Sequence, residues 1–182
     1  MIISWRKHTM TGSAEPVFGD SITSAFSGLP NPDNNNLYTL AVGDSSLYQE
    51  GFRILLGAGS AGATVLNVEK IIDSTHIGVS SPFNQAPKAW GSGTIIALDM
   101  PCAQIWIQGQ DGNAASIWIG TDNTVTNAGG GSAFREIQKV ATSGIPDKFD
   151  IANDGPGPNN NSTLLWMAGT ASDHALIGCR IT

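Results

Sequence analysis

Residues 102–125 read C-A-Q-I-W-I-Q-G-Q-D-G-N-A-A-S-I-W-I-G-T-D-N-T-V and contain the tripeptide Ile-Trp-Ile twice, at 105–107 and 117–119. A polar segment with a central glycine separates the two copies. Short runs of β-branched and aromatic residues around such a linker are typical of a β-hairpin. The sequence therefore predicts that the two copies pair as neighbouring strands, with Trp106 directly across from Trp118.

Side chains alternate along a strand, so the isoleucines of this hairpin share one face and the tryptophans share the other. We expect the isoleucine face to be the core face; it consists of Ile105, Ile107, Ile117 and Ile119. Two alternatives are open for the tryptophans. They form either a cross-strand aromatic contact that a loop or a second sheet covers, or a patch that another protein covers.

The composition favours an all-β protein. Of the 182 residues 41% are hydrophobic and only 13% are charged, while 22 are glycine and nine are proline. Short apolar runs separated by Asn, Ser, Thr and Gly are typical of a chain with many turns. No window of a dozen residues has a convincing helical period, and the best short helical candidate is 133–140, which is also a plausible strand.

Three regions are predicted. Residues 1–36 carry scattered apolar residues, prolines and asparagines, so we expect an extended N-terminal arm that is either disordered or ordered against a neighbouring subunit. Residues 37–98 are expected to form a small antiparallel β-barrel or curled sheet, and residues 99–182 a β-sandwich. The expected strands are 37–42, 52–56, 64–72, 76–79 and 94–98 in the barrel and 133–140, 148–151, 164–167 and 175–181 in the sandwich.

The charge and hydropathy exclude two classes of partner. The formal net charge is −6 and the calculated pI about 4.8, so the chain lacks the basic footprint of a nucleic-acid-binding protein. No apolar run reaches transmembrane length, so we expect no membrane partner. No secretory signal is recognisable at the N-terminus, and the chain is expected to work where it is made or to travel inside an assembly.

One motif raises the possibility of an enzyme. The segment V-F-G-D-S at 17–21 resembles the first block of the SGNH (GDSL-type) hydrolases, which implies a serine esterase with Ser21 as the nucleophile. Asp173 and His174 are adjacent, which breaks the spacing of that family's late block, and Ile151 replaces the glycine of its G-x-N-D block. Helices between parallel strands are also missing. We therefore expect no enzyme, and keep the esterase as the weakest alternative.

Metal and cofactor sites are not indicated either. The histidines lie far apart in the sequence without ligand spacing; they are His8, His76 and His174. Aspartates in glycine- and asparagine-rich loops lack the calcium-loop series, so we expect turn-capping roles for them; they are Asp111, Asp122 and Asp154. Cys102 and Cys179 have no metal-ligand spacing, and whether they pair stays open.

Several segments resemble structural proteins of tailed bacteriophages. Residues 42–79 contain V-G-D-S-S, G-F-R-I and D-S-T-H-I-G-V in an order that looks like a module common in those proteins. I-W-I-G-T-D-N-T-V at 117–125 is similar to an "x-I-Y-V-G-D-S-T-V" strand and turn of phage head and fibre β-domains, and L-L-W-M-A-G-T at 164–170 resembles their penultimate strand. Together the matches cover roughly residues 40–182.

This resemblance implies a virion structural protein of the capsid cement or decoration type. Such a protein assembles in the host cytoplasm, lies on the capsid exterior, forms a homo-trimer and bridges neighbouring subunits of the major capsid protein. The alternative within the class is a tail, fibre or head-completion protein that binds the host surface, with a glycan as one conceivable ligand of its aromatic faces. We expect the partner-binding residues to be Trp5, Phe18, Trp90, Trp106 and Trp118.

Overall fold

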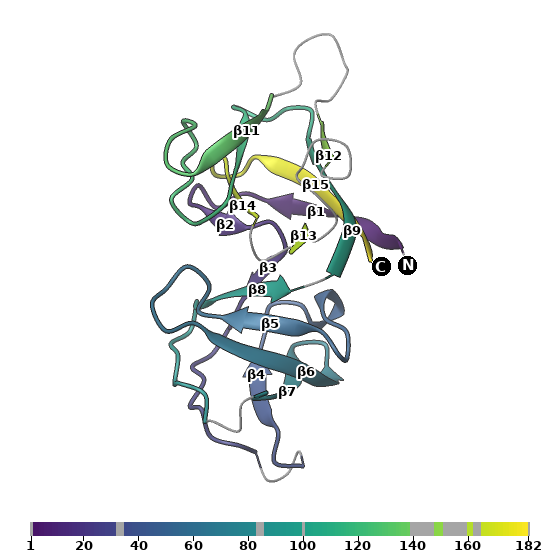
Figure 1. Ribbon diagram of the computed structural model, residues 1–182, viewed down its shortest axis with the longest axis vertical. Helices are drawn as coiled ribbons and strands as arrows, with labels where there is room; N and C mark the ends of the chain where they lie inside the picture. The colour runs from purple at the N-terminus through teal and green to yellow at the C-terminus, as the bar shows by residue number, and fades with distance from the viewer. Residues whose placement is uncertain are drawn as a thin grey trace. The chain divides into compact units, whose positions relative to one another are not determined.

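The computed structural model describes residues 2–31, 35–82, 86–99, 101–138, 148–150, 160–161 and 165–181 (Figure 1). In these residues the regular structure consists of β-strands and one short 3-10 helix, η2 (Ser45–Leu47). The chain divides into two compact units. Unit 1 contains Met1–Val17 and Met100–Thr182, and unit 2 contains Phe18–Asp99. The predicted all-β fold, with a barrel-like sheet and a sandwich, is confirmed.

Unit 1 is a sandwich of two antiparallel sheets (Figure 1). Sheet A has the strand order β1-β15-β9-β12, with β13 also paired to β9. Its strands are β1 (Ile2–Thr9), β9 (Pro101–Gly109), β12 (Lys148–Asp150), β13 (Asn160–Asn161) and β15 (His174–Ile181). Sheet B has the order β11-β10-β14-β2. Its strands are β2 (Glu15–Pro16), β10 (Ile117–Gly120), β11 (Ala133–Ile137) and β14 (Trp166–Ala168).

For residues 102–125, the predicted hairpin pairing is wrong, but the predicted core face is correct. β9 pairs with β15, β12 and β13, whereas β10 pairs with β11 and β14, so the two Ile-Trp-Ile copies lie in different sheets. Their isoleucines all have 0% of their surface exposed, as expected for the core face; they are Ile105, Ile107, Ile117 and Ile119. Trp106 and Trp118 consequently lie on the outer faces of different sheets and do not face each other.

Long-range hydrogen bonds hold the connection between β9 and β10. The Asn113 side chain donates to the His174 carbonyl and accepts from the His174 N–H, both at 2.9 Å. The buried Asp173 carboxylate accepts from the N–H groups of Ala114 at 2.7 Å and Ala115 at 3.1 Å. The linker is therefore fixed to the start of β15, where the chain passes from sheet A to sheet B.

Unit 2 is one curled sheet of six strands, sheet C, with the order β3-β8-β5-β6-β7-β4. Its strands are β3 (Gly19–Ser21), β4 (Tyr38–Ala41), β5 (Arg53–Leu56), β6 (Thr64–Asp73), β7 (His76–Ser80) and β8 (Ile95–Asp99). The five strands predicted between residues 37 and 98 are confirmed to within one residue at each end. A bridge between Ile22 and Val42 joins the two edges of the sheet, which gives it a barrel-like form.

The predicted extended arm of residues 1–36 differs from the structure. Its first part forms β1, which pairs antiparallel with β15, and β2, which pairs with β14. From Phe18 onward the chain belongs to unit 2 and forms β3. Five apolar residues of this segment are buried in the units, whereas Leu29 is exposed; the buried ones are Met10, Val17, Phe18, Ile22 and Phe26. These strands could not be predicted from the local sequence pattern, because they pair only with segments far away in the chain.

Candidate functional site

Asp20, from the G-D-S motif, is a structural acceptor. Its Oδ2 accepts hydrogen bonds from the N–H groups of Gly43 (3.1 Å) and Asp44 (3.4 Å) and from the Tyr48 hydroxyl (3.1 Å). Its Oδ1 accepts from the N–H of Ser21 at 2.7 Å. The carboxylate thus ties β3 to the turn after β4, the place where sheet C closes.

The histidines are distributed over both units. His8 lies in unit 1 with its Nε2 3.2 Å from a Glu15 carboxylate oxygen, and His174 begins β15 in the same unit. In unit 2, the His76 Nδ1 lies 3.0 Å from both carboxylate oxygens of Asp73. Among the residues that the structure describes, no group of three or more His, Cys, Asp or Glu side chains could hold a metal ion.

Two aspartates cap turns, as expected for Asp122. The Asp122 Oδ1 accepts from the Thr124 hydroxyl at 2.6 Å and from its N–H at 2.8 Å, and these bonds lower the pKa of the carboxyl. In unit 2, the N–H of Thr75 and then the ring of His76 lower the pKa of Asp73 in the same way. Both carboxyls are exposed, so their first role is to fix the local turn.

Trp118 is covered by a loop of its own chain. A Cβ on Gly129 would lie 2.8 Å from the Cη2 of Trp118, so only a glycine lets the backbone rest on the indole. Gly129 also has a φ of +76°, which favours glycine. Trp118 is half-buried, while Phe134 on the neighbouring strand β11 is 52% exposed. The sequence-based prediction named Trp118 and omitted Phe134, which is the more exposed of the two aromatic side chains.

Trp90 marks a second surface, in unit 2. Its backbone forms a bridge with Phe26, with N–O distances of 2.8 and 2.9 Å. The half-buried indole rests on Gly57, and the Nζ of Lys88 lies 4.6 Å from the ring centroid. Leu29, three residues beyond Phe26, is 71% exposed. Leu29 is not among the contact residues predicted from the sequence, because an isolated leucine beside a proline carries no periodic signal.

The other expected contact residues lie elsewhere. Phe18 is only 5% exposed, so it is a core residue. Its expected role as a surface contact is therefore wrong. Trp106 is half-buried on β9, opposite Gly178 of β15 and Asp150 of β12. Trp5 lies on β1 and its side chain is outside the described part of the structure. Phe18 and Trp90 thus belong to unit 2, while Trp106 and Trp118 lie in different sheets of unit 1.

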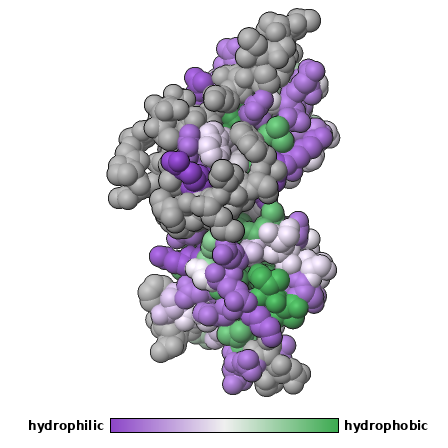
Figure 2. All heavy atoms as spheres, turned by 90° about the vertical axis from the view of Figure 1, so that its right-hand side faces the viewer, coloured by the Kyte–Doolittle hydropathy of each residue, from purple (hydrophilic) through white to green (hydrophobic). Residues whose placement is uncertain are grey.

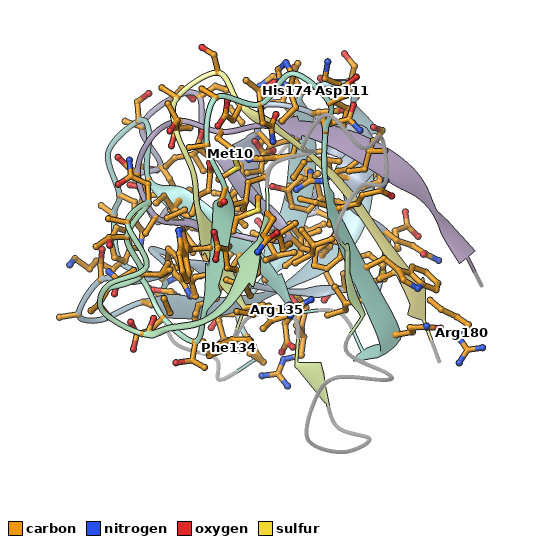
Figure 3. The ribbon with its side chains drawn as sticks, turned by 90° about the horizontal axis from the view of Figure 1, so that it is seen from above. Met10, Asp111, Phe134, Arg135, His174 and Arg180 are labelled. Carbon is orange, nitrogen blue, oxygen red and sulfur yellow. The ribbon has the colours of Figure 1, made fainter. Side chains whose placement is uncertain are left out.

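Two views of the molecule show where some of its side chains lie. Figure 2 shows hydrophobic side chains gathered among hydrophilic ones on the visible face of unit 2, the lower part of the picture. Figure 3 labels Phe134 and Arg135 on β11 and shows Arg180 of β15 extending away from the ribbon.

Comparison with protein-family models found no matching family, and comparisons with curated proteins and with solved structures found no match. Within the described ranges, no helix is long and apolar enough to cross a membrane.

Proposed function

We propose that the chain is a virion structural protein of a tailed bacteriophage, of the capsid cement or decoration type. It binds the outer capsid surface and bridges neighbouring subunits of the major capsid protein. The observation that carries this proposal is the pair of exposed apolar side chains on separate compact units, Leu29 in unit 2 and Phe134 in unit 1. A bridging protein needs two contact surfaces, and each unit offers one.

The unit 2 surface combines Leu29 with the Trp90 segment. Leu29 is the most exposed of the large hydrophobic residues in the described ranges, at 71%. Full burial of a leucine side chain stabilises by about 1.5–3 kcal/mol, so covering Leu29 contributes about 1–2 kcal/mol. The ammonium of Lys88 beside the indole of Trp90 adds a charged group that a carboxylate of the partner can meet.

The unit 1 surface is formed by β11 and β10. Phe134 is 52% exposed, and Glu136 on the same strand lies opposite the half-buried Trp118. An exposed aromatic ring beside charged side chains is a common centre of a protein contact, because the ring buries a large area at a small cost in conformational entropy. This surface is the second half of the proposed bridge.

Each contact is weak by itself, but the regular lattice of capsid subunits allows both contacts of one chain to form at the same time. When one unit is bound, the other meets its target at a high effective concentration, so two weak contacts give strong attachment without any new interaction. A homo-trimer, which the resemblance to cement proteins implies, multiplies the contacts again. This arrangement needs no catalytic group, and the hydrogen bonds of Asp20 support a structural role for the G-D-S motif.

The proposal is tested by binding to capsids prepared without this protein from the phage that encodes it. We expect the purified chain to co-sediment with these capsids and to elute alone at the mass of three chains. Leu29→Ser and Phe134→Ser should each reduce binding, while Ile72→Ser, which changes another exposed apolar residue (36%), should bind like the parent. Attachment to tails and not to heads would favour the tail or fibre alternative and contradict the cement proposal.

A further inference from the structure

The outer face of sheet A, on the side away from the sandwich core, combines an aromatic ring, amides and cations. Its inner positions are fully buried, as at Ile107 and Ile177, so the alternate positions of the same strands face outward. The outer face of sheet A is here defined by Lys7 of β1, Gln104, Trp106 and Gln108 of β9, and Leu176 and Arg180 of β15. All six residues are at least partly exposed.

The register places Trp106 at the centre of this face. Gly178 lies directly opposite Trp106, so the position that pairs with Trp106 on β15 carries no side chain. Cys179 pairs with Ile3 and Ile177 with Arg6, which sets Ser4 and Trp5 together opposite Gly178 as a β-bulge. Two of the five tryptophans of the chain therefore occupy backbone positions on either side of one glycine.

The charge of this face differs from that of the whole chain. Lys7 and Arg180 are exposed, and neither forms an ion pair with another described residue. In a chain with a formal net charge of −6, the outer face of sheet A is thus a cationic area and is complementary to an anionic ligand.

The dimensions favour a chain-like ligand over a protein. Three strands about 4.8 Å apart and a length of about seven residues give a strip of about 15 by 24 Å, or about 350 Å². A stable protein interface needs about 800 Å² on each partner. Lys7 lies opposite Leu176, four residues before Arg180, so the two cations are separated by about 14 Å along the strands. They therefore suit separate anionic groups of one extended molecule.

We propose that the outer face of sheet A binds an acidic oligosaccharide. The apolar side of a sugar ring packs on Trp106, and the amides of Gln104 and Gln108 can donate to and accept from its hydroxyl groups. The guanidinium of Arg180 pairs with a carboxylate in bidentate fashion, and Lys7 pairs with a second carboxylate. This activity is a surface-adhesion function that does not depend on the capsid proposal.

The test is titration of the purified full chain with hexasaccharides, followed by calorimetry and tryptophan fluorescence. Oligogalacturonate and oligosialic acid are the acidic probes, and maltohexaose is the neutral control. We expect an acidic probe to bind and maltohexaose not to bind. Arg180→Gln should weaken binding about tenfold, the loss of one charged hydrogen-bonded pair, and Trp106→Ala should weaken it at least as much.

Lys70→Gln is the matched control, because Lys70 is an exposed lysine of unit 2 and its loss changes the net charge equally. It should bind like the parent. If Trp106→Ala fails to fold, Arg180→Gln and Lys7→Gln still decide the question, since both side chains are exposed. Absence of binding to both acidic probes, or an equal loss in Lys70→Gln and Arg180→Gln, would overturn the proposal.

Discussion

The carboxylate of Asp173 accepts a hydrogen bond from the backbone N–H of Ala114 at 2.7 Å, across a separation of 59 residues. The bond fixes the connection between the two Ile-Trp-Ile strands to the beginning of the last strand. The chain consequently passes from one sheet of the sandwich to the other between the two copies. One buried carboxylate thus joins the segment that decides the fold of unit 1 to the strand that completes sheet A.

Replacement of Asp173 should therefore destabilise the protein. Asp173 is 5% exposed, and Asp173→Ala leaves two N–H groups without their charged acceptor. We expect a loss of about 3 kcal/mol in the free energy of unfolding, measured by urea denaturation. Asp111→Ala, in the same connection but exposed, should change it by less than about 0.5 kcal/mol. Equal effects of the two variants would contradict this role of Asp173.

For the two Ile-Trp-Ile strands, the sequence predicted which residues face the core and failed to predict which strands pair. Alternation along Ile105, Trp106 and Ile107 is a local property, so the buried face could be assigned from the pattern alone. The partner of each strand depends on contacts such as that between Asp173 and Ala114, for which a single sequence holds no local signal. A short polar linker with a glycine suits a hairpin and a crossing between sheets equally well.

The exposure of individual aromatic and apolar residues was hard to predict for the same reason. Trp90 and Trp118 were singled out because tryptophan is conspicuous in loops and strands, and Trp118 lies on the strand that pairs with β11, which carries the exposed Phe134. Leu29 and Phe134 were missed, since the exposure of a single apolar residue depends on how the surrounding strands pack. Phe18 was misassigned because its burial comes from strands of unit 2 that lie far away in the sequence.

Gly129 should tolerate no side chain. Gly129→Ala adds a Cβ 2.8 Å from Trp118 at a φ of +76°, so it combines a steric clash with backbone strain. We expect a loss of about 2–3 kcal/mol in the free energy of unfolding. Gly112→Ala has a φ of +87° with nothing within 4 Å, and should cost only about 1 kcal/mol. Chemical denaturation of both variants separates the backbone strain, which they share, from the steric clash, which only Gly129→Ala has. Equal losses in the free energy of unfolding would argue against the contact between Gly129 and Trp118.

Replacement of Asp20 should lower the free energy of unfolding, whereas replacement of Ser21 should leave it nearly unchanged. Asp20→Ala removes the acceptor that closes sheet C, with an expected loss of about 2–3 kcal/mol in the free energy of unfolding. Ser21→Ala should stay within about 0.5 kcal/mol of the parent. Neither the parent nor Ser21→Ala should hydrolyse a short-chain ester above background. Hydrolysis by the parent that Ser21→Ala abolishes would establish the esterase alternative instead.

Acid should destabilise both units through their capping aspartates. The folded state lowers the pKa values of Asp73 and Asp122 below their usual 3.8, so the unfolded chain binds their protons first as the pH falls. Their contribution is present above this usual value and is lost as the pH falls through the lowered one. Asp73→Asn and Asp122→Asn should flatten the decrease in urea midpoint below about pH 4. An unchanged pH dependence in the double variant would refute this assignment.

The most direct measurement of the central claim, that the chain cements a capsid through contacts on both units, is the temperature at which capsids release their DNA. Capsids carrying the parent protein should open at a higher temperature than capsids without it. Capsids carrying Phe134→Ser should open close to the temperature of undecorated ones, because one half of the bridge is missing. An opening temperature that is the same with the parent protein and without it would contradict the claim.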